Sequence, residues 1–463
     1  KMLSVVFDTD NYDLQTLVQA YANSYFTNLQ KLNDNLANYN LKTFIWSEIR
    51  DKYRYEGEGQ NIYEFVIEVF ENSFPLTQKS GLTSDARLIL SSWRDSFTMR
   101  ESYQKISAEI ADILNIEELL QTAELKDIVE DELFELTDKK IIFELVHRLQ
   151  GRDISHDRFQ NIIKTRESKF WFSEYKHLYR ALENAYMMFE LIDNARCDYD
   201  SVETAVKQYV ETDYRVDYHY RKFYEHFHQS AKKNIMKSLL DNVEKAYVNK
   251  WLFDCGNAYQ RLLNDKKKWH FENMMMQRNF FKDKVSPILE RQKVVVIISD
   301  ALRYECGVEL ASEINSISKF DAKLEMMIGV VPSYTQLGMA ALLPHKRLSF
   351  DGKSDTVLTD GLSSMGSDNR EKILQYNTQR AALTMQAREF MQMKSAERRI
   401  AIRDNEILYI YSNKIDKSGD DKMTENEVFE AVRLEIEQLR ELVVAATSAN
   451  ASRVLVTSDH GFI

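Results

Sequence analysis

Acidic residues follow short apolar segments in the last third of this 463-residue sequence. Asp300 comes just after the run 294–298, and Asp459 with His460 comes just after the run 453–457. Carboxylates that meet in one place repel each other and raise each other's pKa unless a cation lies between them. Any one of these residues alone would be interpreted as a helix cap. The complete set, with its Asp-His pair, predicts a metal site.

Two more predicted strands of this region also end in acidic residues. Asp360 follows the segment 356–359, and Asp416 lies shortly after the segment 407–411. In open α/β sheets, ligands bind beyond the carboxyl ends of the strands. We therefore expect all four strand ends to converge.

Thr335 is the candidate nucleophile. It ends the segment Pro332-Ser333-Tyr334-Thr335, between a predicted strand at 324–331 and a predicted helix at 335–343. A hydroxyl at a helix start meets free N–H groups that favour phosphate, and a metal can hold it as an alkoxide. An ordinary N-cap is the simpler interpretation of the spacing alone. The acidic set favours the chemical role.

Other hydrolase motifs do not fit. A haloacid dehalogenase phosphatase needs Asp-x-Asp after its first strand, whereas Asp300 is followed by Ala301 and Leu302. A sulfatase needs a Cys or Ser followed by Pro and Arg at fixed spacings, which Ser333 and Thr335 both lack. There is no Walker loop and no H-E-x-x-H segment.

The distribution of glycine and the spacing of apolar residues indicate which helices and strands position these residues. Residues 1–289 contain five of the 13 glycines, and residues 290–463 contain eight. Few turns and apolar residues at three- and four-residue spacings predict long helices in the first part. We predict a mixed or helical region at 1–78, with a possible strand at Leu3–Phe7, then a helical domain at 79–289.

Residues 290–463 are predicted to form an α/β sheet with helices on both faces. The run 294–298 is wholly apolar and β-branched, which is typical of a strand buried on both faces. Strands alternate with helices in the pattern of such sheets. The further predicted strands are 324–331, 356–359, 407–411 and 453–457, and the predicted helices are 303–315, 335–343, 371–403 and 424–449.

Composition limits the binding partners and the cellular compartment expected for the protein. The net charge of −11 argues against indiscriminate binding to nucleic acid, although a local basic groove stays possible. Cys197, Cys255 and Cys306 form no C-x-x-C pair, which fits a reducing compartment. No run is long and apolar enough to span a membrane, and no export signal is visible. We expect a cytoplasmic protein without a membrane contact.

Several segments resemble, in order, the PglZ family, the phosphatase-like components of BREX phage-defence systems. The resemblance covers roughly residues 80–463 and is closest to the type A proteins. It implies the fold of the alkaline phosphatase superfamily, whose sites hold two divalent metals. The segments that carry it are 214–224, 294–304, 332–345, 360–364, 369–374 and 411–420.

The resemblance also assigns site residues. Asp300, Thr335, Asp459 and His460 would surround one metal, and Asp416 with Asp420 would replace the superfamily's Asp-x-x-x-His pair at the other. A further histidine ligand is expected beyond Ile463, because the chain has the form of a piece of a longer protein. Zinc is the superfamily's usual metal, and manganese or magnesium would also suit carboxylates. Arg303 could reach a phosphate or join an ion pair.

The resulting hypothesis is a metal-dependent phosphate-ester hydrolase in which Thr335 attacks phosphorus in line and forms a phospho-threonine. Phosphodiesters, including nucleotides or nucleic acid, are the expected substrates because of the defence context. Hydrolysis of a phosphomonoester on a partner protein is the alternative. A third hypothesis is a scaffold whose helical part binds other BREX components beside a weak site.

Overall fold

The computed structural model describes residues 1–77, 79–264, 266–352, 354–416 and 425–461. The chain forms two compact units. Unit 1 consists of Lys1–Leu182 with Ser230–Asn242, and unit 2 consists of Glu183–Gln229 with Val243–Ile463. The domain boundaries after residues 78 and 289 stay predictions of the sequence.

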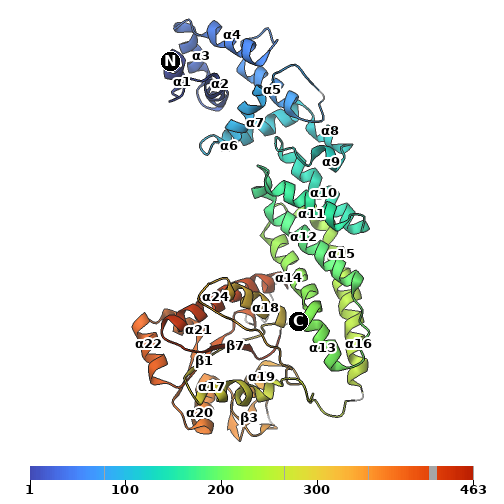
Figure 1. Ribbon diagram of the computed structural model, residues 1–463, viewed down its shortest axis with the longest axis vertical. Helices are drawn as coiled ribbons and strands as arrows, with labels where there is room; N and C mark the ends of the chain where they lie inside the picture. The colour runs from blue at the N-terminus through green and yellow to red at the C-terminus, as the bar shows by residue number, and fades with distance from the viewer. Residues whose placement is uncertain (78, 265, 353, 417–424, 462–463) are drawn as a thin grey trace. The chain divides into compact units, whose positions relative to one another are not determined.

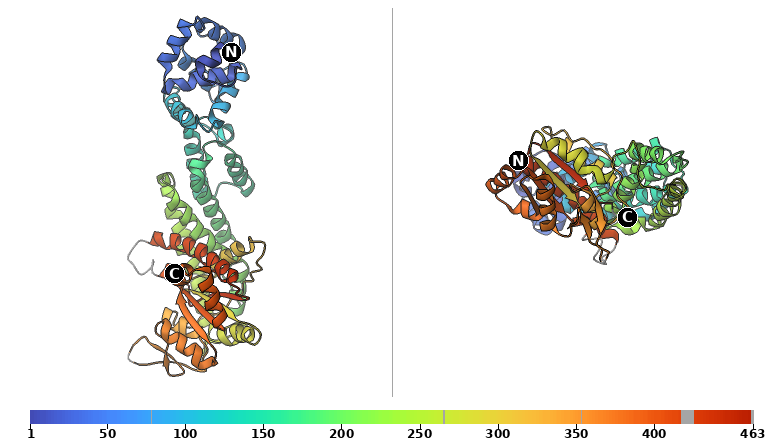
Figure 2. Two further views of the ribbon diagram at one scale, coloured as in Figure 1. Left: turned by 90° about the vertical axis from the view of Figure 1, so that its left-hand side faces the viewer. Right: turned by 90° about the horizontal axis from the view of Figure 1, so that it is seen from below.

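The regular elements among the described residues of unit 1 are all helices (Figure 2). Its core contains a buried ion pair in which Arg166 Nη2 lies 2.6 Å from Asp138 Oδ2. Its helices are α1 (Met2–Phe7), α2 (Leu14–Asn23), η1 (Ser24–Phe26), α3 (Leu29–Asn38), α4 (Lys42–Tyr53), α5 (Ile62–Ser73), α6 (Asp85–Asp95), α7 (Arg100–Ile113), α8 (Ile116–Gln121), α9 (Leu125–Ile128), α10 (Glu135–Gly151), α11 (His156–Glu167), the first half of α12 (Phe172–Asn194), η3 (Lys233–Met236) and most of α15 (Lys237–Glu244).

The possible strand at Leu3–Phe7 is wrong, because these residues lie in α1. Leu3 and Phe7 are buried, whereas Val5 between them is 81% exposed. Residues four positions apart share one helix face, so burial of these two side chains suits a helix. A short apolar run does not distinguish the two structures by periodicity.

The first part of unit 2 consists of helices. The second half of α12 is followed by α13 (Val202–Gln208), η2 (Tyr209–Asp213), α14 (Tyr214–Gln229), η4 (Lys245–Leu252), α16 (Phe253–Leu263), η5 (Gln277–Asn279), η6 (Phe281–Val285) and α17 (Ser286–Leu289). The predicted helical region before the sheet is therefore confirmed.

A four-stranded parallel sheet follows, in the order β5-β6-β1-β7. Every residue of β1 and β6 is buried, as expected for central strands covered on both faces. The strands are β1 (Val294–Ser299), β5 (Ala382–Gln386), β6 (Ile407–Ser412) and β7 (Val454–Ser458). The connecting helices are α18 (Tyr304–Asn315), α19 (Thr335–Ala341), α20 (Ser367–Thr378), α21 (Ala387–Gln392), α22 (Ser395–Asp404) and α24 (Glu425–Ser448).

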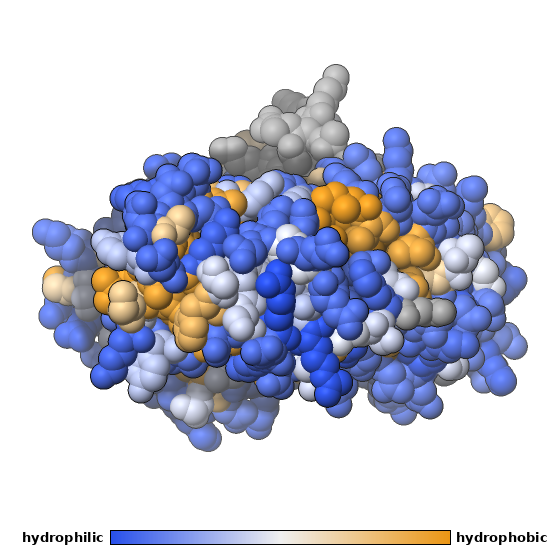
Figure 3. All heavy atoms as spheres, turned by 90° about the horizontal axis from the view of Figure 1, so that it is seen from above, coloured by the Kyte–Doolittle hydropathy of each residue, from blue (hydrophilic) through white to orange (hydrophobic). Residues whose placement is uncertain are grey.

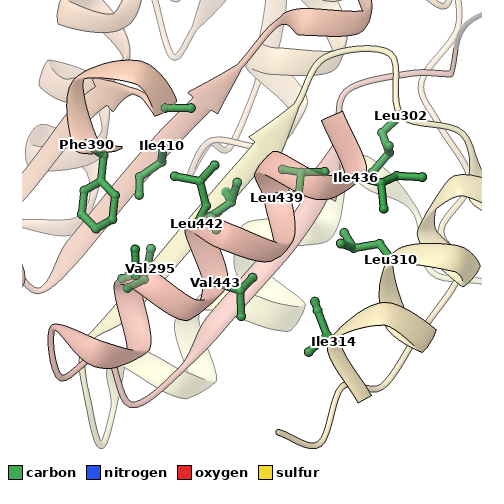
Figure 4. Close-up of a cluster of buried hydrophobic side chains, with 14 of the residues drawn as sticks. Val295, Leu302, Leu310, Ile314, Phe390, Ile410, Ile436, Leu439, Leu442 and Val443 are labelled. Carbon is green, nitrogen blue, oxygen red and sulfur yellow. The ribbon is translucent and has the colours of Figure 1, made fainter. Parts of the chain in front are cut away.

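Helices cover both faces of this sheet (Figure 1). Val295 and Ile297 point to the face packed by α18, α21 and α24. Figure 4 shows Leu439, Leu442 and Val443 of α24 among the side chains of this layer. Val294, Val296 and Ile298 point to the other face, against α17, α19 and α20. Successive side chains of β1 thus alternate between the two faces, as expected of a strand covered by helices on both sides. The predicted α/β architecture is confirmed.

Three predictions about individual elements are wrong. Residues 324–331 form no strand, and Ile328 alone makes an isolated bridge, to Met276. The predicted helix at 371–403 contains the short edge strand β5, which no glycine or proline separates from its neighbours. The segment 356–359 does form a strand, but in a separate antiparallel sheet made of β2 (Leu348–Phe350), β3 (Val357–Thr359) and β4 (Leu362–Ser363).

The face of the molecule drawn in Figure 3 is mainly hydrophilic, and its hydrophobic residues lie in separate patches. Among the described residues, none of the helices combines the length and the low charge needed to cross a membrane.

Gly338 allows α19 to approach the end of β7. A Cβ atom at this position would lie 2.4 Å from the backbone oxygen of Asp459. We expect Gly338→Ala to lower the free energy of unfolding by about 1–3 kcal/mol, because backbone must move to relieve the overlap. Denaturant unfolding checks this value.

Gly256 in α16 provides the matched control, because a Cβ atom there would have no neighbour within 4 Å. Gly256→Ala should be neutral or stabilising by up to about 1 kcal/mol, since alanine favours helix. Equal effects of the two substitutions would contradict the close approach at Gly338.

Candidate metal centre

The parallel register brings three strand ends to one edge of the sheet. Ser299, the last residue of β1, pairs with Ser412 of β6 and with Ser458 of β7. The backbone N–H of Asp300 then donates to the carbonyl of Ser412 at 2.8 Å. The residues that follow these three strands must therefore lie close together.

Asp300, Asp416, Asp459 and His460 meet at this edge, and we call them the acidic cluster. One possible ligand atom from each of Asp300, Asp416 and His460 lies within 4.8 Å of the others. His460 Nε2 lies 3.4 Å from Asp300 Oδ1 and 3.4 Å from Asp459 Oδ2. Carboxylate oxygens and an imidazole nitrogen are suitable ligands for zinc and manganese.

A strained turn holds Asp300 in place. Ala301 has a φ of 66°, in the left-handed region that non-glycine residues rarely adopt. Its N–H donates to Asp459 Oδ1 at 3.2 Å, and the N–H of Leu302 donates to Ser458 Oγ at 2.9 Å. Both bonds come from the end of β7, so the two ligand-bearing segments support each other.

The cluster is rich in negative charge, which the nearby Arg370 offsets only in part. Burial raises the pKa of Asp300 to about 8, and the nearby charges of Asp459 and Asp416 add to this. Burial also raises the pKa of Asp459. Asp300 Oδ1 and Asp459 Oδ2 are buried and have no hydrogen-bond donor among the described residues. A divalent cation would satisfy both oxygens, so the residues present fit a metal.

The Nε2 atom of His460 is oriented toward the acidic cluster, and the Nδ1 atom contacts the backbone. Nδ1 lies 3.2 Å from the carbonyl oxygen of Gly461, which can only accept a hydrogen bond. Nδ1 therefore carries the proton in this contact, and Nε2 of a neutral ring keeps its lone pair. A backbone carbonyl on the other nitrogen is the usual arrangement for a metal-binding histidine.

Thr335 lies beside the cluster as the first residue of α19. Its Oγ1 is 3.0 Å from His460 Nε2. Gln277 helps to hold this arrangement, because its side chain accepts from the N–H of Val330 and donates to the carbonyl of Asp459. Gln277 is buried, and no sequence signal indicated this role.

Three further predicted residues are not part of the acidic cluster as described. Asp360 does not join the other strand ends, because β3 belongs to the antiparallel sheet, and its carboxylate accepts from the N–H groups of Lys346 and Arg347. The expected convergence of four strand ends is therefore wrong for this one. Arg303 forms an ion pair with Asp217, 2.6 Å apart. Asp420 lies outside the described residues.

Glu435 of α24 is a buried acid that lies beneath the same strand ends. The sequence did not indicate it as a candidate. Its oxygens accept from Ser299 Oγ at 2.7 Å and from Ser412 Oγ at 2.9 Å. Burial raises its pKa. One feature of the sequence could have indicated that Glu435 is buried: it lies in the apolar stripe of its helix, between Val432 and Leu439.

Comparison with known proteins agrees with this architecture. A family model described as the BREX system PglZ alkaline phosphatase-like domain matches residues 280–463. The alkaline phosphatase-like protein BrxZ of Escherichia coli O9:H4 (strain HS) is 32% identical over 462 residues, which cover 92% of this chain and 53% of that protein. The alkaline phosphatase-like protein PglZ of Bacillus cereus (strain H3081.97) is 29% identical over 459 residues, which cover 95% and 53%.

The chain thus spans about half the length of these curated relatives. Residues 280–463, which contain the parallel sheet, therefore match the PglZ alkaline phosphatase-like domain of BREX systems.

Proposed function

We propose that this chain carries the catalytic centre of a metal-dependent phosphate-ester hydrolase that acts in BREX defence, with Thr335 as the nucleophile. The observation that carries the proposal is the 3.0 Å distance between Thr335 Oγ1 and His460 Nε2, next to two buried carboxylates that each have one oxygen without a hydrogen-bond partner among the described residues. A nucleophile beside a metal centre explains both features.

The acidic cluster would hold a divalent cation through Asp300, Asp459, His460 and Asp416. When bound, such an ion supplies positive charge that favours the alkoxide form of a neighbouring hydroxyl and stabilises charge on phosphate oxygens. Asp416 lies with Asp300 and His460, so the described residues support one centre. A second centre built on Asp416 and Asp420, and the choice among zinc, manganese and magnesium, remain part of the proposal.

The chain's own residues orient the nucleophile. The close contact between Gly338 and Asp459 sets the position of α19, and the contact between Thr335 and His460 holds the hydroxyl. Thr335 would attack phosphorus in line and form a phospho-threonine, while the bond to the leaving alcohol breaks and that alcohol takes up a proton. Water would then cleave the bond between Thr335 and phosphorus, which restores the hydroxyl and releases a phosphate monoester from a diester substrate, or phosphate from a monoester. The Nε2 atom of His460 can accept the hydroxyl proton or bind the cation.

Phosphodiesters, including nucleotides or nucleic acid, are the proposed substrates. A cavity of about 940 Å³ borders Asp459 and His460, which is enough for a nucleotide-sized ligand. Aromatic and basic side chains, the types that bind nucleotides, are among its lining residues, namely Tyr209, Tyr247, Phe280, Lys284 and Lys323. Phosphomonoester hydrolysis on a partner protein is the alternative.

Binding of other BREX components is a second proposed function, and it concerns unit 1. The described residues of unit 1 contribute nothing to the acidic cluster. They do expose large apolar side chains, such as Phe44 at 53% and Phe97 at 97%. Exposed aromatic residues favour protein interfaces over catalysis.

Thr335→Ala should abolish hydrolysis while the metal stays bound. Loss of an essential nucleophile costs at least about a thousandfold in kcat. Turnover of bis(4-nitrophenyl) phosphate and 4-nitrophenyl phosphate, measured with metal content, checks this and separates diesterase from monoesterase activity. A full-length protein is the proper material.

Thr335→Ser is the matched control, because it keeps the hydroxyl and should retain turnover. Equal turnover of the Ala variant and the wild type would remove Thr335 from the mechanism. Metal-free protein without turnover would instead favour the scaffold.

Without divalent ions, the stability of the fold should fall as pH rises. The pKa of Asp300 is raised to about 8 in the folded chain. A carboxyl whose pKa is raised by folding contributes stability below its unfolded pKa, and this contribution is lost as pH rises through the folded value. Melting temperatures in chelator, from about pH 6 to about pH 9, measure the loss.

Asp300→Asn mimics the neutral carboxyl and should flatten this pH profile, whereas Asp321→Asn, at an exposed position, should not. Addition of Mn²⁺ should restore the wild type most strongly at the alkaline end. An unchanged slope in Asp300→Asn would show that the cluster is not the cause.

A further inference from the structure

The tyrosine-rich segment 214–224, which opens α14, carries two buried charges. Asp217 is 4% exposed and Arg221 is 1% exposed. Buried charges are costly unless they are paired and hydrogen-bonded. Both find their partners at the start of α18, the helix that follows Asp300.

Asp217 is saturated by three donors. Its Oδ2 lies 2.6 Å from Arg303 Nη2 and accepts from the hydroxyl of Tyr209 at 2.6 Å. Its Oδ1 accepts from the hydroxyl of Tyr247 at 2.9 Å. Two tyrosines from η2 and η4 thus hold the carboxylate that binds Arg303.

Arg221, one helical turn after Asp217, connects α14 to α18 through ion pairs. Its Nη2 lies 2.8 Å from Glu305 Oε2, and it also contacts Glu309. Lys222 lies 2.8 Å from Glu309. The alternating charges make a buried connection between α14 and the first turns of α18.

Arg303 links this connection to the acidic cluster. It lies three residues after Asp300 and is the N-cap residue of α18. Its side chain also packs against the residue after His460, because a Cβ atom on Gly461 would lie 3.1 Å from Arg303 Cγ. Arg303 therefore touches both segments that supply proposed ligands, across a turn strained at Ala301.

We propose that Asp217 is a positioning residue that holds Asp300 and His460 in their metal-binding arrangement through Arg303. The inference rests on the proposed metal centre. The sequence suggested that Arg303 could bind a phosphate or join an ion pair. In the proposed role, Asp217 pairs with the Arg303 guanidinium.

Asp217→Asn tests the proposal through metal affinity. Isothermal titration calorimetry with Zn²⁺, and in parallel with Mn²⁺, on the full chain should show a tenfold or greater loss, as for other residues that orient metal ligands. Tyr247→Phe removes a single donor to Asp217, should fold normally, and should weaken binding severalfold. Retained affinity in both variants would overturn the proposal.

Asp138→Asn is the matched control. It removes the same charge from a buried Asp–Arg pair, but in unit 1. Its affinity for both metals should equal that of the wild type, even if its melting temperature falls. Equal loss in the control would show a general stability effect and contradict a positioning role. Absence of metal binding in the wild type would instead contradict the proposed function.

A separate observation concerns two cysteines of unit 2. Cys197, between α12 and α13, and Cys255 of α16 have their Sγ atoms 2.9 Å apart, although they are 58 positions apart in sequence. Both are free and half-buried. A cavity of about 280 Å³ lined by Cys197, Lys250 and Arg261 gives small molecules access to Cys197.

We propose that Cys197 and Cys255 form a peroxide-sensitive thiol pair. The Cys197 thiolate attacks one oxygen of hydrogen peroxide, which gives a sulfenic acid and releases hydroxide. The Cys255 thiol then displaces the sulfenic oxygen as water and closes a disulfide. Two thiols are oxidised while one peroxide is reduced, and a thiol reductant reverses the step.

Peroxide treatment of the full chain followed by alkylation and peptide mapping tests this pairing. The expected product is an intramolecular 197–255 link that dithiothreitol removes, with the buried Cys306 left as a free thiol. In Cys255→Ser, Cys197 should instead react with dimedone as a sulfenic acid. Failure to form the link, or a link to Cys306, would overturn the proposal.

Discussion

The α/β part concentrates negative charge at one edge of its sheet, and the described residues neutralise this charge only in part. Asp300 and Asp459 are buried at the end of adjacent strands, and each keeps one oxygen without a donor among the described residues. Burying unpaired carboxylates costs stability, and their raised pKa values reflect this cost. A bound cation would offset this cost, and Thr335 lies beside the place where such an ion would bind.

The parallel sheet makes this arrangement possible. Because β1 lies between β6 and β7 in register, the residues after three strands far apart in sequence meet at one edge. The helices on both faces bury the strands and leave only their ends accessible. Contacts from outside the sheet then hold the ligand-bearing turns: Gln277 holds the carbonyl of Asp459, and Asp217 holds Arg303.

Much of this could be predicted from sequence because it depends on local patterns. Wholly apolar, β-branched runs identify central strands, and an acidic residue after each run identifies the edge. The edge strand β5 was missed because its sequence, Ala-Leu-Thr-Met-Gln, has neither feature. Asp360 was misplaced because a strand pattern does not say to which sheet a strand belongs. Gln277, Glu435 and Asp217 act through long-range contacts, which no spacing in the sequence reveals.

The contrast between Glu435 and Asp300 indicates which buried acid is structural. Both lie at the ends of β1 and β6, and burial raises the pKa of both. Each oxygen of Glu435 accepts a hydroxyl hydrogen bond, from Ser299 and Ser412, so this acid is satisfied within the protein. Asp300, the next residue after Ser299, instead faces Asp459, Asp416 and His460. Among the described residues, Asp300 Oδ1 has no hydrogen-bond donor, so Asp300 is the acid that could bind a cation, in agreement with the proposed centre.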